Sequence, residues 1–87
     1  MDRVAQYEEI HNEAFELFKN KNRDYSDSFA SYGIIGVLVR MNDKVQRFVS
    51  VSNSKIQLVD DEKLHDTLID LVNYSVMALM LLKEEEK

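Results

Sequence analysis

The residues of this chain best suited to chemistry are two carboxylates and an amide inside its most apolar stretch. Asp66, Asp70 and Asn73 are spaced at i, i+4 and i+7, so on an α-helix they lie on one face. A buried carboxylate is costly unless a cation, a metal ion or hydrogen-bond donors meet it. These carboxylates, with Glu62 one turn earlier and Asp43 from elsewhere, could hold Mg²⁺, or they could pair with a basic neighbour. The spacing leaves both alternatives open.

A basic face in the middle of the chain is one candidate for that neighbour. Arg40, Lys44 and Arg47 share one side of a helix with Asp43. Guanidinium groups bind carboxylates or phosphates through two parallel hydrogen bonds. We therefore expect this face to pair with the aspartates, to bind phosphate, or to do both from its two sides.

Polar and aromatic side chains crowd the segment from Lys19 to Phe29. Tyr25 could stack on a nucleobase, while Asn22, Asp24 and Ser28 could hydrogen-bond to a base or a sugar. The alternative is an interhelical turn whose side chains bond to their own backbone. Taken alone, this segment favours the turn.

Three helices must position these groups. The periodicity of apolar residues predicts helices over residues 3–21, 35–51 and 62–83. Asp2 is the expected N-cap of the first helix, and Asp60 or Asp61 that of the third. A polar loop over 22–36 should separate the first two helices, and residues 84–87 should fray.

The run from Val76 to Leu82 is apolar on every side of the third helix. Two other helices in a chain of 87 residues cannot cover it all round. We therefore predict an all-α protein with a single domain over residues 1–87, a small bundle of about three helices per chain completed by homo-oligomerisation. The alternative is a monomer with an exposed apolar end.

The composition argues against several classes of protein. The chain has no cysteine, which excludes disulfides and thiolate metal sites. Its longest apolar run is far shorter than the roughly 20 residues that span a bilayer, and its start lacks a signal-peptide pattern. We therefore expect a cytoplasmic protein with no membrane partner. The net charge of −5 argues against duplex nucleic acid as a partner, whereas the cations of the middle segment suit a small phosphorylated ligand.

The polar motifs, in their order and spacing, resemble a phage-associated family called the nucleotide modification associated domain. The motifs are Lys19-x₄-Asp24-Tyr25-x-Asp27-Ser28, Gly36-Val37-Leu38-Val39-Arg40-Met41-x-Asp43-Lys44-x₂-Arg47, Asp61-Glu62 and Asp66-Thr67-Leu68-x-Asp70-Leu71-x-Asn73-Tyr74. That family is similar to the MazG-like all-α nucleoside triphosphate pyrophosphatases. The resemblance covers about residues 12–82 and implies a helical oligomer with a nucleotide pocket between helices, often between subunits.

The chain departs from the MazG-like enzymes at one motif. Those enzymes hold Mg²⁺ against the triphosphate with two carboxylate motifs on separate helices. Asp66 and Asp70 resemble the later motif, but the segment from Arg40 to Arg47 carries three cations where the enzymes carry glutamates. This exchange lowers the affinity for a divalent metal and raises the affinity for phosphate.

The motifs and the resemblance together define a set of expected site residues. The expected ligand-binding residues are Lys19, Asn22, Asp24, Tyr25, Ser28, Arg40, Lys44, Arg47, Asn73 and Tyr74. No cofactor is required, but if Mg²⁺ binds, Asp43, Asp66 and Asp70 are its expected ligands.

We prefer the hypothesis that the protein binds a phosphorylated nucleotide and holds it without hydrolysis. It would sequester a nucleotide signal, as phage counter-defence proteins do in the cytoplasm of the host. The alternative is a Mg²⁺-dependent nucleoside triphosphate pyrophosphatase. A third hypothesis is a helical interaction protein without a ligand, in which the charged stripes only form ion pairs between helices.

Overall fold

The fold is all-α, as the periodicity predicts. A computed structural model of the chain describes residues 1–53 and 61–85. These residues form the helices α1 (Arg3–Tyr25), α2 (Gly33–Asn53) and α3 (Asp61–Glu85), with a short 3₁₀-helix η1 (Ser28–Tyr32) between α1 and α2. They contain no strand. The prediction of a three-helix, all-α chain is confirmed.

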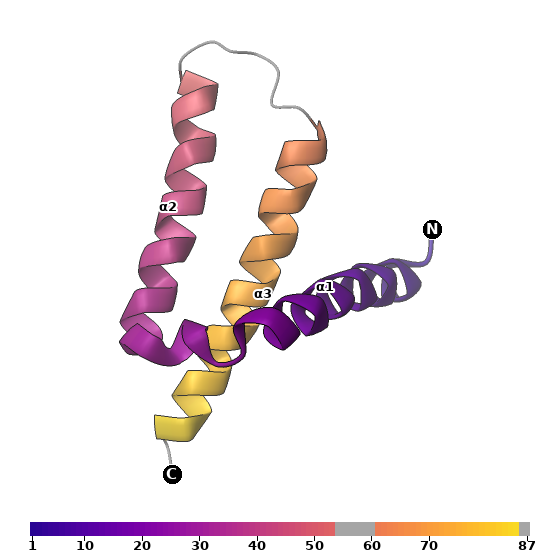
Figure 1. Ribbon diagram of the computed structural model, residues 1–87. Coiled ribbons are helices and arrows are strands. Elements are labelled where there is room, and N and C mark those ends of the chain that lie inside the picture. Colours follow the sequence, from indigo (N-terminus) through magenta and orange to yellow (C-terminus); the bar gives the residue numbers. More distant parts are fainter. Residues whose placement is uncertain (54–60, 86–87) are drawn as a thin grey trace.

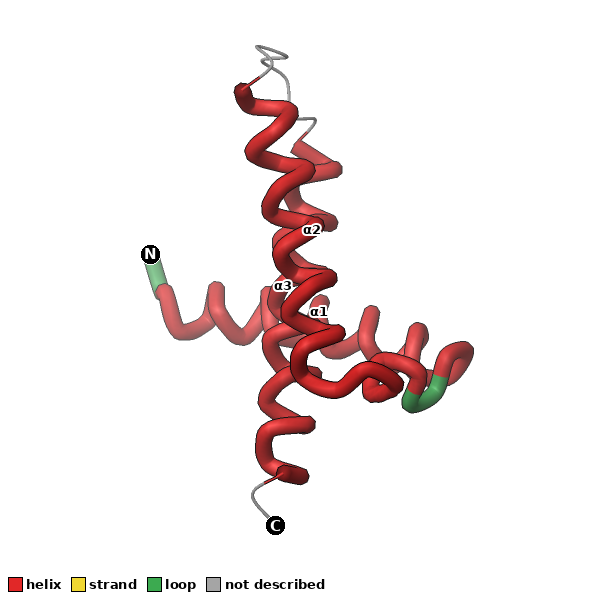
Figure 2. Tube along the Cα trace, turned by 90° about the vertical axis from the view of Figure 1, so that its left-hand side faces the viewer, coloured by secondary structure: helices red, strands yellow, loops and turns green. Residues whose placement is uncertain are grey.

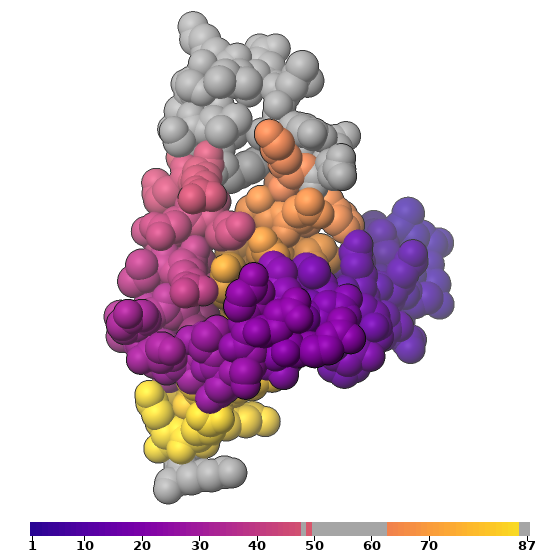
Figure 3. All heavy atoms as spheres, viewed as in Figure 1, coloured from indigo at the N-terminus to yellow at the C-terminus, as the bar shows by residue number. Residues whose placement is uncertain are grey.

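The helices form an antiparallel pair crossed by a third helix. α2 and α3 run side by side in opposite directions, and α1 crosses α3 near the lower end of the pair (Figure 1). The turned view shows α1 running across the long direction of the other two helices (Figure 2). In the space-filling view α1 forms a continuous band over α3, and the C-terminal part of α3 emerges below it (Figure 3). α1 therefore packs mainly against α3, while η1 packs against α2.

The first helix begins where predicted but ends later. Asp2 accepts a hydrogen bond from the Ala5 backbone N–H at 3.1 Å, which confirms it as the N-cap. α1 then continues to Tyr25, so Asn22 is helical and the predicted loop over 22–36 is wrong in its first part. Contacts of the C-terminal half of α1 with the other helices outweigh the weak helix propensity of its Asn and Asp residues.

The connection from α1 to α2 is short because two residues adopt positive φ. Ser26 has φ +51°, and its backbone N–H donates to the Asn22 carbonyl at 2.7 Å, closing the end of α1. Gly33 has φ +66°, a conformation that glycine reaches without steric cost, and it joins η1 to α2. At Gly36 a Cβ atom would lie 2.6 Å from the Cβ of Tyr32, so glycine permits this close approach.

The third helix is also longer than predicted. It begins at Asp61, one of the two predicted N-caps, and the other, Asp60, lies outside the described residues. Glu84 and Glu85 continue the helix. Lys and Glu are good helix formers, and this explains the extension.

The core is small and apolar. Its buried hydrophobic members among the described residues are Ala14, Val37, Ile69 and Leu81. Val4 and Tyr7 are exposed in the N-terminal part of α1, which extends beyond α3 (Figure 1). On α2, Val37 is buried and its neighbour Leu38 is exposed.

Candidate functional site

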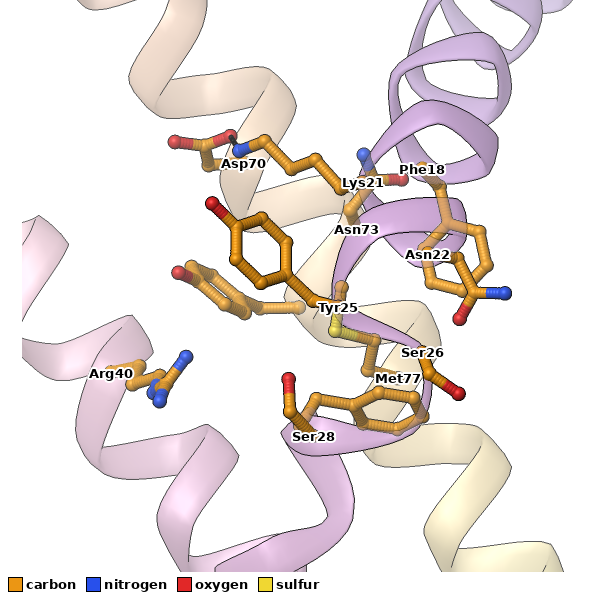
Figure 4. A pocket seen from close by; sticks show the side chains of 12 residues that line it. Phe18, Lys21, Asn22, Tyr25, Ser26, Ser28, Arg40, Asp70, Asn73 and Met77 are labelled. Atoms are coloured by element: carbon orange, nitrogen blue, oxygen red, sulfur yellow. Dashed lines mark hydrogen bonds and ion pairs between the residues drawn. The ribbon is translucent and has the colours of Figure 1, made fainter.

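A cavity of about 420 Å³ lies where α1, η1, α2 and α3 meet. The residues that line it are Phe18, Lys21, Asn22, Tyr25, Ser26, Ser28, Phe29, Arg40, Asp70, Asn73, Tyr74 and Met77. Figure 4 shows Arg40 approaching from α2, with Tyr25 and Ser28 on the far side and Asp70 and Lys21 together at one end. Every described helix therefore contributes to one hollow.

A buried hydrogen bond determines how α1 presents its side chains to this cavity. The Asn73 side-chain amide donates to the Ala14 backbone carbonyl at 3.0 Å, and both residues are buried. From Ala14, Phe18, Lys21 and Tyr25 follow at i+4, i+7 and i+11, on the same face of α1. The contact that attaches α1 to α3 therefore also directs these side chains to the cavity.

Asp70 is held by two lysines. Its Oδ2 lies 3.1 Å from the Lys44 Nζ, and its Oδ1 lies 3.5 Å from the Lys21 Nζ. The Asp70 side chain is only 19% exposed, and that of Lys44 30%, so water screens this pair less than a surface pair. Within the predicted aspartate stripe, Asp70 thus has cationic partners, and these are lysines of α1 and α2.

A second polar contact joins α1 to α3 away from the cavity. The His65 Nε2 lies 2.7 and 2.9 Å from the two carboxylate oxygens of Glu13. The hydrogen bond and the charge of Glu13 raise the pKa of His65 above its usual value, and the charge of Asp66 adds to the effect. The side chains of His65 and Glu13 are both about half exposed, so this contact lies at the surface.

The cavity contains most of the expected ligand-binding residues. Those that line it are Asn22, Tyr25, Ser28, Arg40, Asn73 and Tyr74. Lys44 lies next to it through Asp70. Asp24 and Arg47 are exposed and do not line it.

Lys19 also points away from the cavity. Its Nζ lies 2.8 Å from a carboxylate oxygen of Glu16 and 4.9 Å from the centre of the Phe15 ring. The cation that enters the cavity from α1 is Lys21, two residues later. Sequence reasoning missed Lys21 as a site residue, together with Phe18, Ser26 and Met77. The helical spacing from Ala14 points to Phe18 and Lys21 once α1 is known to extend to Tyr25.

The described carboxylates are not gathered at the cavity. Among the described side chains, no three His, Cys, Asp or Glu residues come together in a way that could hold a metal ion. Both oxygens of Asp70 face lysine ammonium groups, while Asp43 and Asp66 lie exposed. The donor set at the cavity is therefore cationic, and it suits an anion.

Fold and site define an all-α protein whose helices enclose a cavity of cations, amides and aromatic rings. The sequence also places it in a family: residues 21–82 match nucleotide modification associated domain 1, and the chain belongs to that family. This confirms the family resemblance, and the matched segment includes every cavity residue except Phe18. No curated protein and no solved structure matches the chain. Within residues 1–53 and 61–85, no helix is both long and apolar enough to span a membrane.

Proposed function

We propose that this protein binds a phosphorylated nucleotide in the cavity and holds it without cleaving it. The observation that carries the proposal is the meeting of cations and aromatic rings in one hollow of an acidic chain. The family name, which refers to nucleotide modification, supports the same ligand class.

The charges at the cavity suit phosphate. Lys21 and Arg40 line it, and Lys44 lies behind Asp70, so three cations accompany one carboxylate. Lys21 is held at the longer distance from Asp70 and is half exposed, so its ammonium group can turn toward a phosphate oxygen at little cost. Arg40 offers a planar fork of donors that matches two phosphate oxygens at once.

The remaining lining suits a base and a sugar. Phe18, Tyr25, Phe29 and Tyr74 provide aromatic faces, and Asn22 provides amide donor and acceptor groups. A cavity of about 420 Å³ lies within the range of sites for small organic ligands. A ligand with one or two aromatic bases and a small number of phosphates can contact both the cations and the aromatic rings of the cavity.

Holding, not cleaving, follows from the donor set. The similarity to MazG-like enzymes that the sequence suggests would place Mg²⁺ on the aspartates, but Asp70 is engaged by two lysines. Cleavage of a phosphoanhydride also needs an activated water, and among the described residues no carboxylate cluster stands ready to hold a metal for it. Sequestration of a nucleotide signal, in a phage or elsewhere, is the role that such a protein would serve.

Isothermal titration calorimetry in EDTA tests the proposal, with ATP, GTP, CTP and UTP as probes and the nucleosides as unphosphorylated controls. We expect heat with at least one nucleotide and none with its nucleoside. Arg40→Gln and Lys21→Gln should each weaken binding by about tenfold, because each removes a charge-assisted hydrogen bond. Lys19→Gln is the matched control, since it removes a lysine two residues from Lys21 that points elsewhere, and it should leave affinity unchanged.

Two outcomes would overturn the proposal. Release of pyrophosphate from a triphosphate, dependent on added Mg²⁺, would identify an enzyme. Absence of binding to every nucleotide probe would leave the ion pairs with a purely structural role.

A further inference from the structure

α3 carries a second apolar face in addition to the one that packs against α1 and α2. Leu68, Val72, Ser75, Leu79 and Leu82 follow one another at steps of four, three, four and three residues. We call these five residues the outer seam. Such steps place them in one line along a helix, with the mean period of 3.5 residues that is typical of helix pairs.

The outer seam is exposed within the single chain. Its four apolar side chains have relative exposures between 39% and 56%. The opposite side of α3 carries the buried Asn73 and Leu81 and the cavity residue Asp70. Asp70 is also the only charged residue between Leu68 and Leu82, so no charge interrupts the seam.

Ser75, at the centre of the outer seam, allows another helix to pack closely there. Its hydroxyl donates to the Leu71 carbonyl at 2.9 Å, within the same helix. Burying this hydroxyl therefore leaves no unsatisfied group, and its small side chain lets another helix approach closely. A polar residue in the middle of the seam thus does not oppose its burial.

The exposed area of the chain is large enough for a partner. It is 7149 Å², whereas a compact chain of 10.2 kDa exposes about 5300 Å². The difference of about 1800 Å² exceeds the roughly 800 Å² that each partner buries in a stable complex. The radius of gyration of 14.8 Å likewise exceeds the value of about 12 Å for a compact chain of this length.

We propose that a second copy of this chain covers the outer seam, with α3 packed antiparallel against α3 about a two-fold axis at Ser75. This register places Leu68 opposite Leu82 of the second copy and Val72 opposite Leu79. An apolar line that is centred on a small residue complements itself, which is what a two-fold contact requires. The antiparallel direction also keeps the acidic ends at Glu84 and Glu85 of the two copies apart. The interface does not depend on the cavity or its ligand.

Sedimentation velocity on the full chain tests this interface. Wild type should sediment as a dimer or as a larger assembly built from it. Leu79→Lys should lower the oligomeric state and keep its helical circular dichroism, because it places a charge in the seam. Ile35→Lys is the matched control, since Ile35 is exposed on α2 outside the seam, and it should leave the assembly intact.

Cysteine cross-linking remains informative even where Leu79→Lys unfolds the chain. The chain has no native cysteine, so each introduced thiol is unique. Under mild oxidation Ser75→Cys should form a covalent dimer, and a mixture of Leu68→Cys and Leu82→Cys should form the mixed dimer in preference to either homodimer. A wild-type monomer at every concentration would overturn the proposal, and so would an assembly in which Ser75→Cys fails to cross-link. Neither result affects the nucleotide titrations, which test the cavity and not this interface.

Discussion

At the scale of single residues, Asp70 decides between the two chemistries that its spacing with Asp66 allows. Removing the Asp70 carboxylate should have different effects if it is a metal ligand and if it is an ion-pair partner of lysine. In the structure Asp70 faces Lys21 and Lys44, so its charge partly neutralises the cations that we assign to phosphate. Its removal should therefore separate stability from binding.

We predict that Asp70→Asn lowers stability and strengthens nucleotide binding. The free energy of unfolding should fall by about 0.5–1 kcal/mol, because a partly exposed carboxylate no longer pairs with two ammonium groups. Affinity for a nucleoside triphosphate should rise by up to about tenfold, because one negative charge leaves the cavity. Urea unfolding and calorimetry measure the two effects. If wild type binds the nucleotide only when Mg²⁺ is added, and Asp70→Asn abolishes that binding, Asp70 is instead a metal ligand.

The buried amide of Asn73 should contribute mainly to the attachment of α1. Asn73→Ala removes its hydrogen bond to the Ala14 carbonyl and leaves a small cavity between α1 and α3. We expect a loss of about 1–3 kcal/mol in the free energy of unfolding, measured by urea denaturation. Asn12→Ala, which removes an exposed amide from α1, is the control and should change stability by less than about 0.5 kcal/mol. Equal effects of the two substitutions would contradict this role for Asn73.

The cavity residues show what a sequence can predict about a site. Arg40, Asn73 and Tyr74 are identifiable because their charge or polarity stands out on an apolar helix face, and such groups need a partner. Lys19 and Lys21 cannot be told apart in this way. Which of them enters the cavity depends on the rotation of α1, and this is determined by a single buried bond from Asn73 to a backbone carbonyl.

At the scale of elements, tertiary contacts explain why the sequence predicts the helices better than their ends. The periodicity of apolar residues reveals each helix, because each must bury one face. The extension of α1 through Asn22 to Tyr25 depends on contacts with α3, which local propensity does not encode. The chain then turns at Ser26 and again at Gly33, on the two sides of η1, and both residues have positive φ.

The contact between α1 and α3 should respond to pH through His65. Glu13 raises the pKa of His65 in the folded chain, so the protonated form is favoured by folding. The stabilisation is fully present below the unfolded pKa of about 6.5 and is lost as the pH rises through the higher folded pKa.

We therefore predict a pH-dependent difference between wild type and His65→Gln. The difference in melting temperature should be larger at pH 6 than at pH 8.5, as thermal circular dichroism can measure. His11→Gln serves as the control, because His11 stacks on Phe15 and is not the partner of Glu13. It shows what the loss of a histidine outside the pair with Glu13 does to the melting temperature. A difference between wild type and His65→Gln that is the same at both pH values would exclude the pair as a pH-sensitive contact.

At the scale of the whole molecule, the single chain exposes more surface than its mass warrants. The sequence already indicates this, because a helix that is apolar on all sides requires cover that two neighbours cannot supply. The structure adds which side is uncovered, namely the outer seam from Leu68 to Leu82. Folding and assembly of such a chain should be coupled.

The melting temperature should therefore depend on protein concentration. For a dimer that unfolds to two chains, an unfolding enthalpy of about 120 kcal/mol per dimer predicts a rise of about 4 °C for each tenfold increase in concentration. Differential scanning calorimetry over a hundredfold range measures this dependence. Leu79→Lys should melt at a lower temperature that does not vary with concentration, because the seam is disrupted and each chain unfolds alone. A wild-type melting temperature that stays constant over the whole range would mean that the chain is stable without a partner, and that its exposed apolar helix face does not drive assembly.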